Sequence, residues 1–441
     1  MNYIGIDIGT STISSVVYNP SSKETDYKTL INDTLLQTPE YWKKSQDPEK
    51  ILDIIEEILS GYIEQYRDIK GIGITGQMHG VLYLDNRGCA ISPLYTWQDG
   101  RGNLIYKNNK SYAEFLSDTT GYKLATGYGL VTHFYNIVNN LVPPGAKKIC
   151  TIMDYVSMKL SGKIEPVTDY TNGAALGFFD VEKLMFDKLA MEKAGIDYSI
   201  VPETDNSEVC LGYYKGIPVY PAIGDNQAAF IGSVEEKQSS VHITVGTSSQ
   251  ISVFTDRYIK IPELDTRPFP GGGYILVGAA LCGGQAFSIL KAFFEKTLIM
   301  FSAKEAYSRG LNDQDIYELM SSVPYKDNLQ DIPVVKTLFD GTRSCPSDRG
   351  SINNISVNNF EPENLVIGFL KGICSELYSF YDNIPEDIKK GKSSIIGSGN
   401  ALKKNPLLCK AFEEQFELNI LFSHCREEAA FGACLTSIKT K

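Results

Sequence analysis

The sequence lacks the cysteine spacing of disulfide-rich and zinc-binding proteins. Its nine cysteines are scattered over 441 residues, are odd in number and never form a Cys-x-x-Cys pair. This distribution indicates neither a disulfide framework nor a zinc knuckle, and it favours a reducing, cytoplasmic compartment.

The chain also lacks an excess of positive charge and any long apolar run. Its 42 Lys and Arg against 53 Asp and Glu leave a net charge of −11, which disfavours nucleic acid and anionic membranes as partners. No apolar run approaches the roughly 20 residues of a membrane-spanning helix, and the N-terminus has no signal-like segment. We therefore expect neither a nucleic-acid nor a membrane partner, and the charge fits a monomer or a homodimer equally well.

Common enzyme signatures are missing as well: a Walker A loop, the protein-kinase motifs, His-Glu-x-x-His and Gly-x-Ser-x-Gly do not occur. On so acidic a chain, an anionic nucleotide would have to be held by turn amides and a metal ion. Strand-like and helix-like segments alternate, which predicts an α/β fold, and the length predicts two domains.

Two similar segments stand far apart in the chain. Residues 4–12 read Ile-Gly-Ile-Asp-Ile-Gly-Thr-Ser-Thr and residues 243–250 read Ile-Thr-Val-Gly-Thr-Ser-Ser-Gln. Each combines an apolar strand, a tight turn and a second β-prone run, so we expect one hairpin in each of two related lobes. A polar stretch before the second hairpin predicts lobes of residues 1–235 and 236–441.

The turns of these hairpins are candidate phosphate-binding sites. Glycine lets the backbone approach an anion, consecutive amides form an anion-binding concavity, and hydroxyl groups add donors. The phosphate-binding candidates are Thr10, Ser11, Gly246 and Thr247. Ordinary turn residues are the alternative interpretation.

Two aspartates are candidates for the reaction itself. Asp7 lies beside the first turn, where a carboxylate would repel phosphate unless a cation intervened, so it is a candidate Mg²⁺ ligand, with turn capping as the alternative. Asp225 follows the strand-like residues 219–223 and precedes a helix, at the position where α/β folds place catalytic groups. A helix N-cap is the alternative there.

Two further segments have the composition of a polyol or sugar pocket. Residues 76–80 place an amide, a methionine and a histidine between glycines, and residues 95–101 combine two aromatic rings with an amide and a charge pair. The candidate sugar-binding residues are Gln77, Met78, His79, Trp97, Asp99 and Arg101. The alternatives are a structural histidine and a structural Asp99–Arg101 ion pair.

A third glycine turn follows the strand-like residues 394–396. Its candidate nucleotide-binding residues are Gly397, Gly399 and Asn400, although such turns also occur for packing alone. Helix starts are indicated at Asp47-Pro48 and at Asn405-Pro406, since each combines an N-cap residue with proline at the first helical position.

In their order along the chain these segments resemble the FGGY carbohydrate kinases nearly end to end. The matching segments are residues 7–10, 76–80, 97–101, 168–172, 224–226, 245–248, 397–399 and 428–433. Within the family the resemblance is greatest to the sedoheptulokinases, through residues 96–101, 154–156 and 337–343. Xylulokinases share Gln77, Met78, His79, Asp99 and Arg101.

The resemblance implies a two-lobed, actin-like ATPase fold of the ribonuclease H-like type, with ATP and sugar in the cleft between the lobes. It implies Asp225 as the base for the sugar's terminal hydroxyl and as a neighbour of Mg²⁺, with Asn226 near the substrate. It assigns the two Gly-Thr turns to phosphates and residues 397–399 to adenosine.

The expected activity is ATP-dependent phosphorylation of a ketose, most simply of sedoheptulose to its 7-phosphate. Two alternatives stay open. One is a kinase for xylulose, another ketose or a polyol. The other is a non-enzymatic ATP-gated binding or assembly protein on the same scaffold, which would need both hairpins but has no use for the sugar-type segments together with Asp225.

Overall fold

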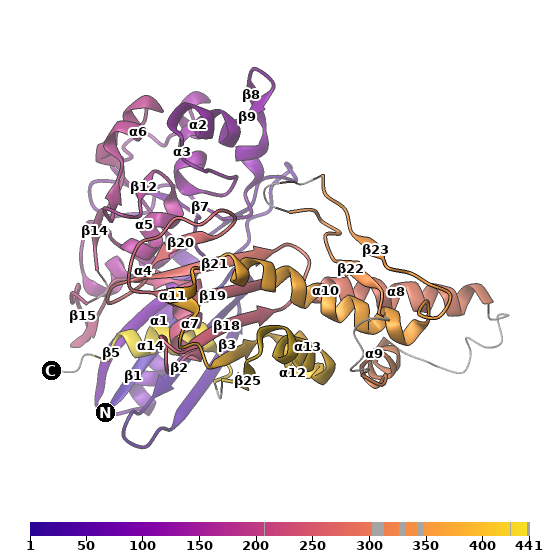
Figure 1. The fold of residues 1–441 in the computed structure, drawn as a ribbon. Helices are drawn as coiled ribbons and strands as arrows, with labels where there is room; N and C mark the ends of the chain where they lie inside the picture. The colour runs from indigo at the N-terminus through magenta and orange to yellow at the C-terminus, as the bar shows by residue number, and fades with distance from the viewer. Residues whose placement is uncertain are drawn as a thin grey trace. The chain divides into compact units, whose positions relative to one another are not determined.

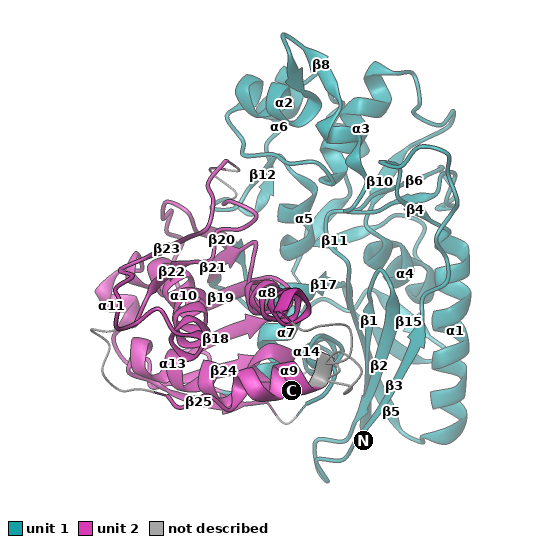
Figure 2. Cartoon of the chain, turned by 90° about the vertical axis from the view of Figure 1, so that its right-hand side faces the viewer, with its two compact units in different colours: residues 1–235, 267–274, 425–441 teal, residues 236–266, 275–424 magenta. Residues whose placement is uncertain are grey.

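The computed structural model describes residues 1–206, 208–301, 313–325, 332–342, 345, 347–423 and 425–438. The chain forms two compact units (Figure 2): unit 1 contains Met1–Glu235, Arg267–Tyr274 and Cys425–Lys441, and unit 2 contains Glu236–Thr266 and Ile275–His424. The predicted lobe break at residues 235 and 236 coincides with a unit boundary. Segments 267–274 and 425–441, however, pack in unit 1 instead of extending the second lobe.

Unit 1 is built on a sheet with the strand order β15-β16-β5-β1-β2-β3, to which β17 adds by pairing with β5. The strands of this sheet are β1 (Asn2–Ile8), β2 (Thr12–Tyr18), β3 (Thr25–Ile31), β5 (Ile69–Gly76), β15 (Gly212–Tyr214), β16 (Ile217–Val219) and β17 (Ile223–Gly224). The smaller strands of unit 1 are β4 (Ser45–Gln46), β6 (Leu82–Leu84), β7 (Leu94–Tyr95), β8 (Ile105–Lys107), β9 (Lys110–Ser111), β10 (Lys148–Cys150), β11 (Val167–Asp169), β12 (Phe179–Asp180), β13 (Met185–Phe186) and β14 (Glu203–Asp205).

The two faces of this sheet are covered by different helices. The helices of unit 1 are α1 (Pro48–Gln65), α2 (Tyr112–Thr120), α3 (Gly129–Val138), α4 (Ile152–Ser161), α5 (Tyr170–Leu176), α6 (Lys188–Lys193), α7 (Asp225–Ser233) and α14 (Glu428–Thr436), with short 3₁₀ turns at Gly100–Asn103 and Tyr198–Ile200. Ile4, Ile6 and Ile8 of β1 share a core with α1. Successive side chains of a strand alternate between faces, so Gly5 and Asp7 point to the other face, which α14 covers.

Unit 2 is built on a sheet with the order β20-β21-β19-β18-β24-β25 (Figure 1). Its strands are β18 (Ser240–Val245), β19 (Ser249–Thr255), β20 (Asp265–Pro268), β21 (Tyr274–Ala280), β24 (Ser394–Ser398) and β25 (Asn419–Phe422), with β22 (Val334–Lys336) and β23 (Ser351–Asn353) forming a separate pair. Its helices are α8 (Gly284–Phe301), α9 (Asp313–Ser321), α10 (Pro362–Asp382), α11 (Glu386–Lys389), α12 (Asn400–Lys404) and α13 (Pro406–Phe416). Side chains of α8, α10 and α13 form one core with β18 and β19.

The two predicted hairpins are confirmed, and the strands around them repeat. β1 pairs antiparallel with β2 and parallel with β5, while β18 pairs antiparallel with β19 and parallel with β24. The predicted helix starts are also confirmed, since Asp47 caps α1 and Asn405 caps α13 through their side chains. Each unit therefore presents a Gly-Thr turn at the end of a central strand.

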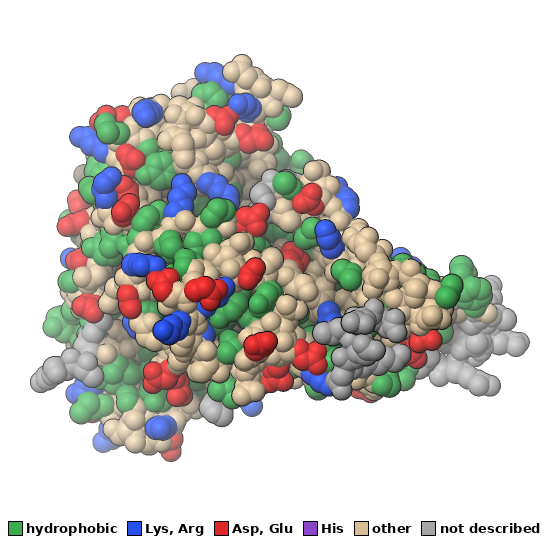
Figure 3. Space-filling view, in the orientation of Figure 1, with side chains coloured by type: hydrophobic (Ala, Val, Ile, Leu, Met, Phe, Trp, Pro, Cys, Tyr) green, Lys and Arg blue, Asp and Glu red, His purple; other side chains and the backbone are tan. Residues whose placement is uncertain are grey.

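Neither the surface charges nor the cysteines indicate where a functional site lies. On the face shown in Figure 3, Lys and Arg side chains are interspersed with Asp and Glu. All nine cysteines are free thiols. Among the described residues, no helix is long and apolar enough to cross a membrane.

Candidate functional site

In unit 1 the two predicted aspartates lie at the carboxyl ends of two strands that each pair in parallel with β5. Asp7 lies near the end of β1, and Asp225 begins α7 directly after β17, with β5 between the two strands. Burial, together with the charges of Asp225 and Glu427, raises the pKa of Asp7 to about 7. Burial also raises the pKa of Asp225, while hydrogen bonds from Asn226 and the charge of Arg267 act in the opposite direction. The result is a half-buried group of mutually repelling carboxylates.

The backbone in front of Asp225 is held by side-chain hydroxyl groups. Thr75 of β5 donates from Oγ1 to the Ile223 carbonyl at 2.8 Å, and the Gly224 amide donates to Thr171 Oγ1 at 2.9 Å. Asn226 donates from Nδ2 to Asp225 Oδ1 at 2.9 Å. These bonds place the carboxylate at the first turn of α7, where a helix N-terminus favours negative charge.

The first hairpin turn is braced from outside the hairpin. Asn32 donates from Nδ2 to the Gly9 carbonyl at 2.8 Å and from its amide to the Ser11 carbonyl at 2.9 Å. Since the turn's carbonyls take these bonds, its amides can still face an anion. Ser11 is exposed. Thr10 accepts from the Trp97 indole nitrogen at 3.0 Å, which joins the phosphate-type turn to a sugar-type residue.

The segment 76–80 crosses the same end of β5. Met78 is buried against Gly224, where an added Cβ would lie 2.6 Å from the Met78 methyl carbon. His79 has a left-handed backbone (φ 73°), pairs through Nδ1 with the Ala175 carbonyl at 2.8 Å and lies 4.6 Å from the Tyr128 ring. A left-handed φ is uncommon for residues other than glycine, so this conformation is held by its surroundings.

Asp99 and Arg101 form a buried ion pair. Arg101 Nε lies 2.6 Å from Asp99 Oδ1, and both side chains are at most 2% exposed. The guanidinium also donates to Asn136 Oδ1 at 2.5 Å and stacks over the Tyr95 ring at 4.1 Å. These contacts fit the structural alternative, in which the pair positions the neighbouring Trp97, whose side chain is 47% exposed. Direct sugar contacts by Asp99 and Arg101 stay a prediction.

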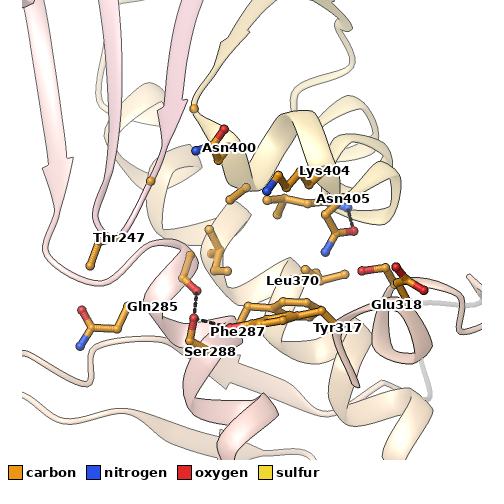
Figure 4. A pocket seen from close by; sticks show the side chains of 17 residues that line it. Thr247, Gln285, Phe287, Ser288, Tyr317, Glu318, Leu370, Asn400, Lys404 and Asn405 are labelled. Atoms are coloured by element: carbon orange, nitrogen blue, oxygen red, sulfur yellow. Dashed lines mark hydrogen bonds between the residues drawn. The ribbon is translucent and has the colours of Figure 1, made fainter. Parts of the chain in front are cut away.

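In unit 2 the second Gly-Thr turn and the third glycine turn line one pocket of about 780 Å³. Gly246, Thr247, Gly399 and Asn400 all contribute to it, whereas Gly397 packs in β24 against Phe422. Figure 4 shows Asn400, Lys404 and Asn405 along one side of the pocket and the rings of Phe287 and Tyr317 along the other. The two rings stack with centroids 6.1 Å apart. The volume and the mixture of aromatic and amide groups suit a nucleoside.

The second hairpin turn rests on the start of α8. The Gly283 amide donates to the Thr247 carbonyl and the Gly284 amide to the Gly246 carbonyl, both at 2.8 Å. A Cβ on Gly283 would lie 2.5 Å from the Ser248 backbone, and one on Gly284 would lie 2.6 Å from the Gly246 carbonyl oxygen. Glycine is therefore required at both positions for this close approach.

Sequence reasoning missed several residues that hold the site together. They are Asn32, Gln46, Thr75, Thr171, Gly283 and Gly284. Two signals were visible in the sequence: Thr171 belongs to the segment 168–172 that resembles the family, and Gly283 and Gly284 are adjacent glycines. Arg343, at the end of the segment 337–343 that resembles sedoheptulokinases, lies outside the described residues.

The carboxylates fit the chemistry of a divalent cation. Asp7 is half-buried, and the charges that act on its carboxylate, those of Asp225 and Glu427, are both negative. The described residues contain no group of three or more His, Cys, Asp or Glu side chains that could hold a metal ion. Two carboxylates suit Mg²⁺, which keeps several waters and takes further ligands from phosphate oxygens.

Comparison with known proteins gives a consistent result. Residues 2–232 match the model of the N-terminal domain of the FGGY family of carbohydrate kinases. The chain is 25% identical to sedoheptulokinase of Mus musculus, over 99% of this chain and 97% of that protein. It is 23% identical to the xylulose kinase of Lactococcus lactis subsp. lactis, over 99% of this chain and 87% of that protein.

The fold has solved counterparts. The crystal structure of gluconate kinase from Lactobacillus acidophilus matches 99% of this chain with a TM-score of 0.80 at 19% identity, and the match covers 88% of that chain. The predicted two-lobed, actin-like α/β fold is thereby confirmed.

Proposed function

The chain belongs to the FGGY family of carbohydrate kinases, and we propose that it transfers the γ-phosphate of ATP to the terminal hydroxyl of a ketose, with sedoheptulose as the preferred acceptor. Use of ATP and of an alcohol acceptor follows from the family. The observation that carries the proposal is Asp225, a half-buried carboxylate at the start of α7 that Asn226 hydrogen-bonds and that directly follows Gly224, against which Met78 packs. The near full-length similarity to sedoheptulokinase supports the choice of sugar.

In the proposed reaction Asp225 accepts the proton of the sugar's terminal hydroxyl. The hydroxyl oxygen forms a bond to the γ-phosphorus, the bond from that phosphorus to the bridging oxygen breaks, and ADP leaves with the bonding electron pair. Asn226 holds one carboxylate oxygen, so the other is the one directed at the substrate proton. Phosphoryl transfer asks the protein mainly for positioning and charge stabilisation.

The other groups then have positioning roles. Trp97 and the segment 76–80 provide the aromatic and polar surface for the sugar, and the amides of both Gly-Thr turns bind phosphate oxygens. The pocket of unit 2 takes the adenosine. Asp7, with Asp225, would hold Mg²⁺, which when bound neutralises charge on phosphate oxygens. A cytoplasmic location is part of the proposal, and the nine free thiols support it.

The raised pKa values predict an unusual pH dependence. An ordinary aspartate has a pKa of 3.8, whereas that of Asp7 is about 7 and that of Asp225 is also raised. A protonated Asp225 cannot accept the substrate proton, so its raised pKa should move the acid limb of kcat/KM to higher pH than an ordinary aspartate would give. The measurement is kcat/KM for the sugar from about pH 5 to about pH 9 at saturating ATP and magnesium.

Glu427→Gln provides the control for this profile. Glu427 is one of the charges that raise the pKa of Asp7, so its removal should move to lower pH the part of the acid limb that Asp7 sets. A wild-type profile that stays flat from about pH 5 to about pH 8 would contradict the assignment of these carboxylates to the reaction.

The choice of sugar is tested by a substrate panel. ADP release is measured with sedoheptulose, xylulose, other ketoses and polyols, and we expect the highest kcat/KM with sedoheptulose. Phosphorus NMR of the product should locate the phosphate on the terminal carbon. If xylulose gives the higher kcat/KM, the seven-carbon assignment is wrong and the similarity to xylulose kinase is the better guide.

A further inference from the structure

Gln46 is a fully buried glutamine that touches both halves of the candidate site in unit 1. It lies in the short strand β4, which pairs with β7 just before Trp97. Its Nε2 donates to the Thr10 carbonyl at 3.0 Å and to Thr34 Oγ1 at 3.1 Å, and its Oε1 accepts from Gln77 Nε2 at 2.8 Å. No part of Gln46 is exposed. All its amide groups are therefore used inside the protein.

These bonds close a ring. Gln46 donates to Thr10, Thr10 Oγ1 donates to Gln77 Oε1 at 3.3 Å, and Gln77 donates back to Gln46. Each member is both donor and acceptor, so the direction of every bond in the ring is consistent with its neighbours. Hydrogen bonds in such networks polarise one another, and loss of one member removes a bond from each of the other two.

The ring joins the two kinds of substrate-binding segment. Thr10 belongs to the phosphate-type turn, and Gln77 belongs to the sugar-type segment 76–80. Trp97 joins the same ring through its indole N–H, which donates to Thr10 Oγ1, and the residue is 47% exposed. If a bound phosphate displaced Thr10, the hydrogen bonds of Thr10 would therefore shift Gln77 and Trp97 as well.

We propose that Gln46 is a positioning residue that couples nucleotide binding at the first hairpin to the sugar-binding segment, through the ring of Gln46, Thr10 and Gln77. This inference rests on the proposed function of the two segments. Coupling of this kind is reciprocal, because ATP and sugar must strengthen each other's binding by the same factor. The Gln46 amide donates to the Thr10 carbonyl and to Thr34 and accepts from Gln77, and leucine at position 46 could make none of these bonds.

The first experiment measures coupling in the full-length enzyme. ADP release is followed with and without the best sugar of the panel, and the stimulation by sugar is compared between variants. Gln46→Leu should reduce this stimulation about tenfold, since two of the three hydrogen bonds of the ring are lost, one of them buried and one partly buried. If Gln46→Leu fails to fold, Gln46→Glu keeps the size and the acceptor but loses the donor to Thr10.

Ser15→Ala is the matched control. Ser15 is fully buried in β2, in the sheet that also contains β1 and β5, and makes two hydrogen bonds, to Tyr62 OH at 2.9 Å and to the Lys28 carbonyl at 3.2 Å, without contacting the ring. It should lower stability while leaving the stimulation by sugar at the wild-type value. Equal stimulation in the Gln46 variants and in Ser15→Ala would overturn the proposal.

The second experiment does not depend on the identity of the sugar. The chain has two tryptophans, so Trp42→Phe leaves Trp97 as the single reporter. Binding of ATP with magnesium, followed independently by the rise in Tm, should change the emission of Trp97, and Gln46→Leu in this background should abolish the change. The coupling is overturned if ATP binds and changes the Trp97 emission equally in Trp42→Phe and in Trp42→Phe with Gln46→Leu. It is also overturned if ATP binds and changes the emission in neither protein. Both outcomes count even where the sugar assignment holds. Loss of sugar phosphorylation across the whole panel with the emission change intact refutes the proposed function alone.

Discussion

Asp225→Asn lowers kcat for sugar phosphorylation about 10²- to 10⁴-fold while ATP still binds, because a positioned general base contributes that much to catalysis. Asparagine keeps the shape of the side chain and an oxygen that can accept the bond from Asn226. It cannot take a proton from the sugar hydroxyl. ATP affinity, measured by calorimetry, should change far less than kcat, since the pocket proposed for adenosine lies in unit 2 and Asp225 does not line it.

The loss of activity in Asp225→Asn will not reflect unfolding. The charge of Asp225 is one of the causes that raise the pKa of Asp7, so its removal relieves repulsion in a half-buried site. The variant should be at least as stable as the wild type in chemical denaturation. Asn226→Ala is the control. It keeps the Asp225 carboxylate but removes the hydrogen bond that Asn226 donates to it, so kcat should fall less than in Asp225→Asn. Turnover of Asp225→Asn at the wild-type rate would exclude Asp225 as the base.

The parts of the fold that were predicted from sequence are those with local causes. An apolar strand, a Gly-Thr turn and a β-prone run suffice to form a hairpin, and both hairpins are present. Asp47-Pro48 and Asn405-Pro406 begin helices because the cap and the proline act within one turn. The strands β1 and β18 therefore follow from neighbouring residues alone.

The parts that were not predicted depend on contacts between distant residues. Whether Asp99 and Arg101 face a ligand or each other is decided by Tyr95 and Asn136, which surround the guanidinium. Nothing near Gln46 in the sequence shows that it bonds to Gln77. The pairing of a residue with partners 31 positions away is a property of the folded chain.

The packing of α14 in unit 1 also depends on residues that are far from it in the sequence. Its small residues meet glycines of unit 1: a Cβ on Gly5 of β1 would lie 1.9 Å from the Ala430 carbonyl oxygen, and one on Gly73 of β5 would lie 1.8 Å from that of Ala433. These glycines let a helix lie directly on the sheet. The pattern of small residues at 428–433 was visible in the sequence, but its partners were not.

Gly432→Ala is expected to lower the free energy of unfolding by about 3 kcal/mol, because overpacking against immovable backbone is among the costlier core changes. Gly432 lies inside α14, and an added Cβ would lie 1.8 Å from the Ala228 carbonyl oxygen of α7. The contact is reciprocal, since a Cβ on Gly232 of α7 would lie 1.9 Å from the Glu428 carbonyl oxygen of α14. Neither backbone can yield without separating the two helices. Urea denaturation of the full chain provides the measurement.

Gly61→Ala gives this prediction a control of opposite sign. Gly61 also lies inside a helix, α1, but it is exposed and a Cβ there meets nothing within 4 Å. Helix propensity alone would make both substitutions stabilising by about 0.5–1 kcal/mol, and Gly61→Ala should show this gain. A gain in stability with Gly432→Ala would mean that α7 and α14 do not interlock. Because α7 begins with Asp225 and Glu427 caps α14, the same variant should also lower kcat in the fraction that stays folded, whereas Gly61→Ala should not.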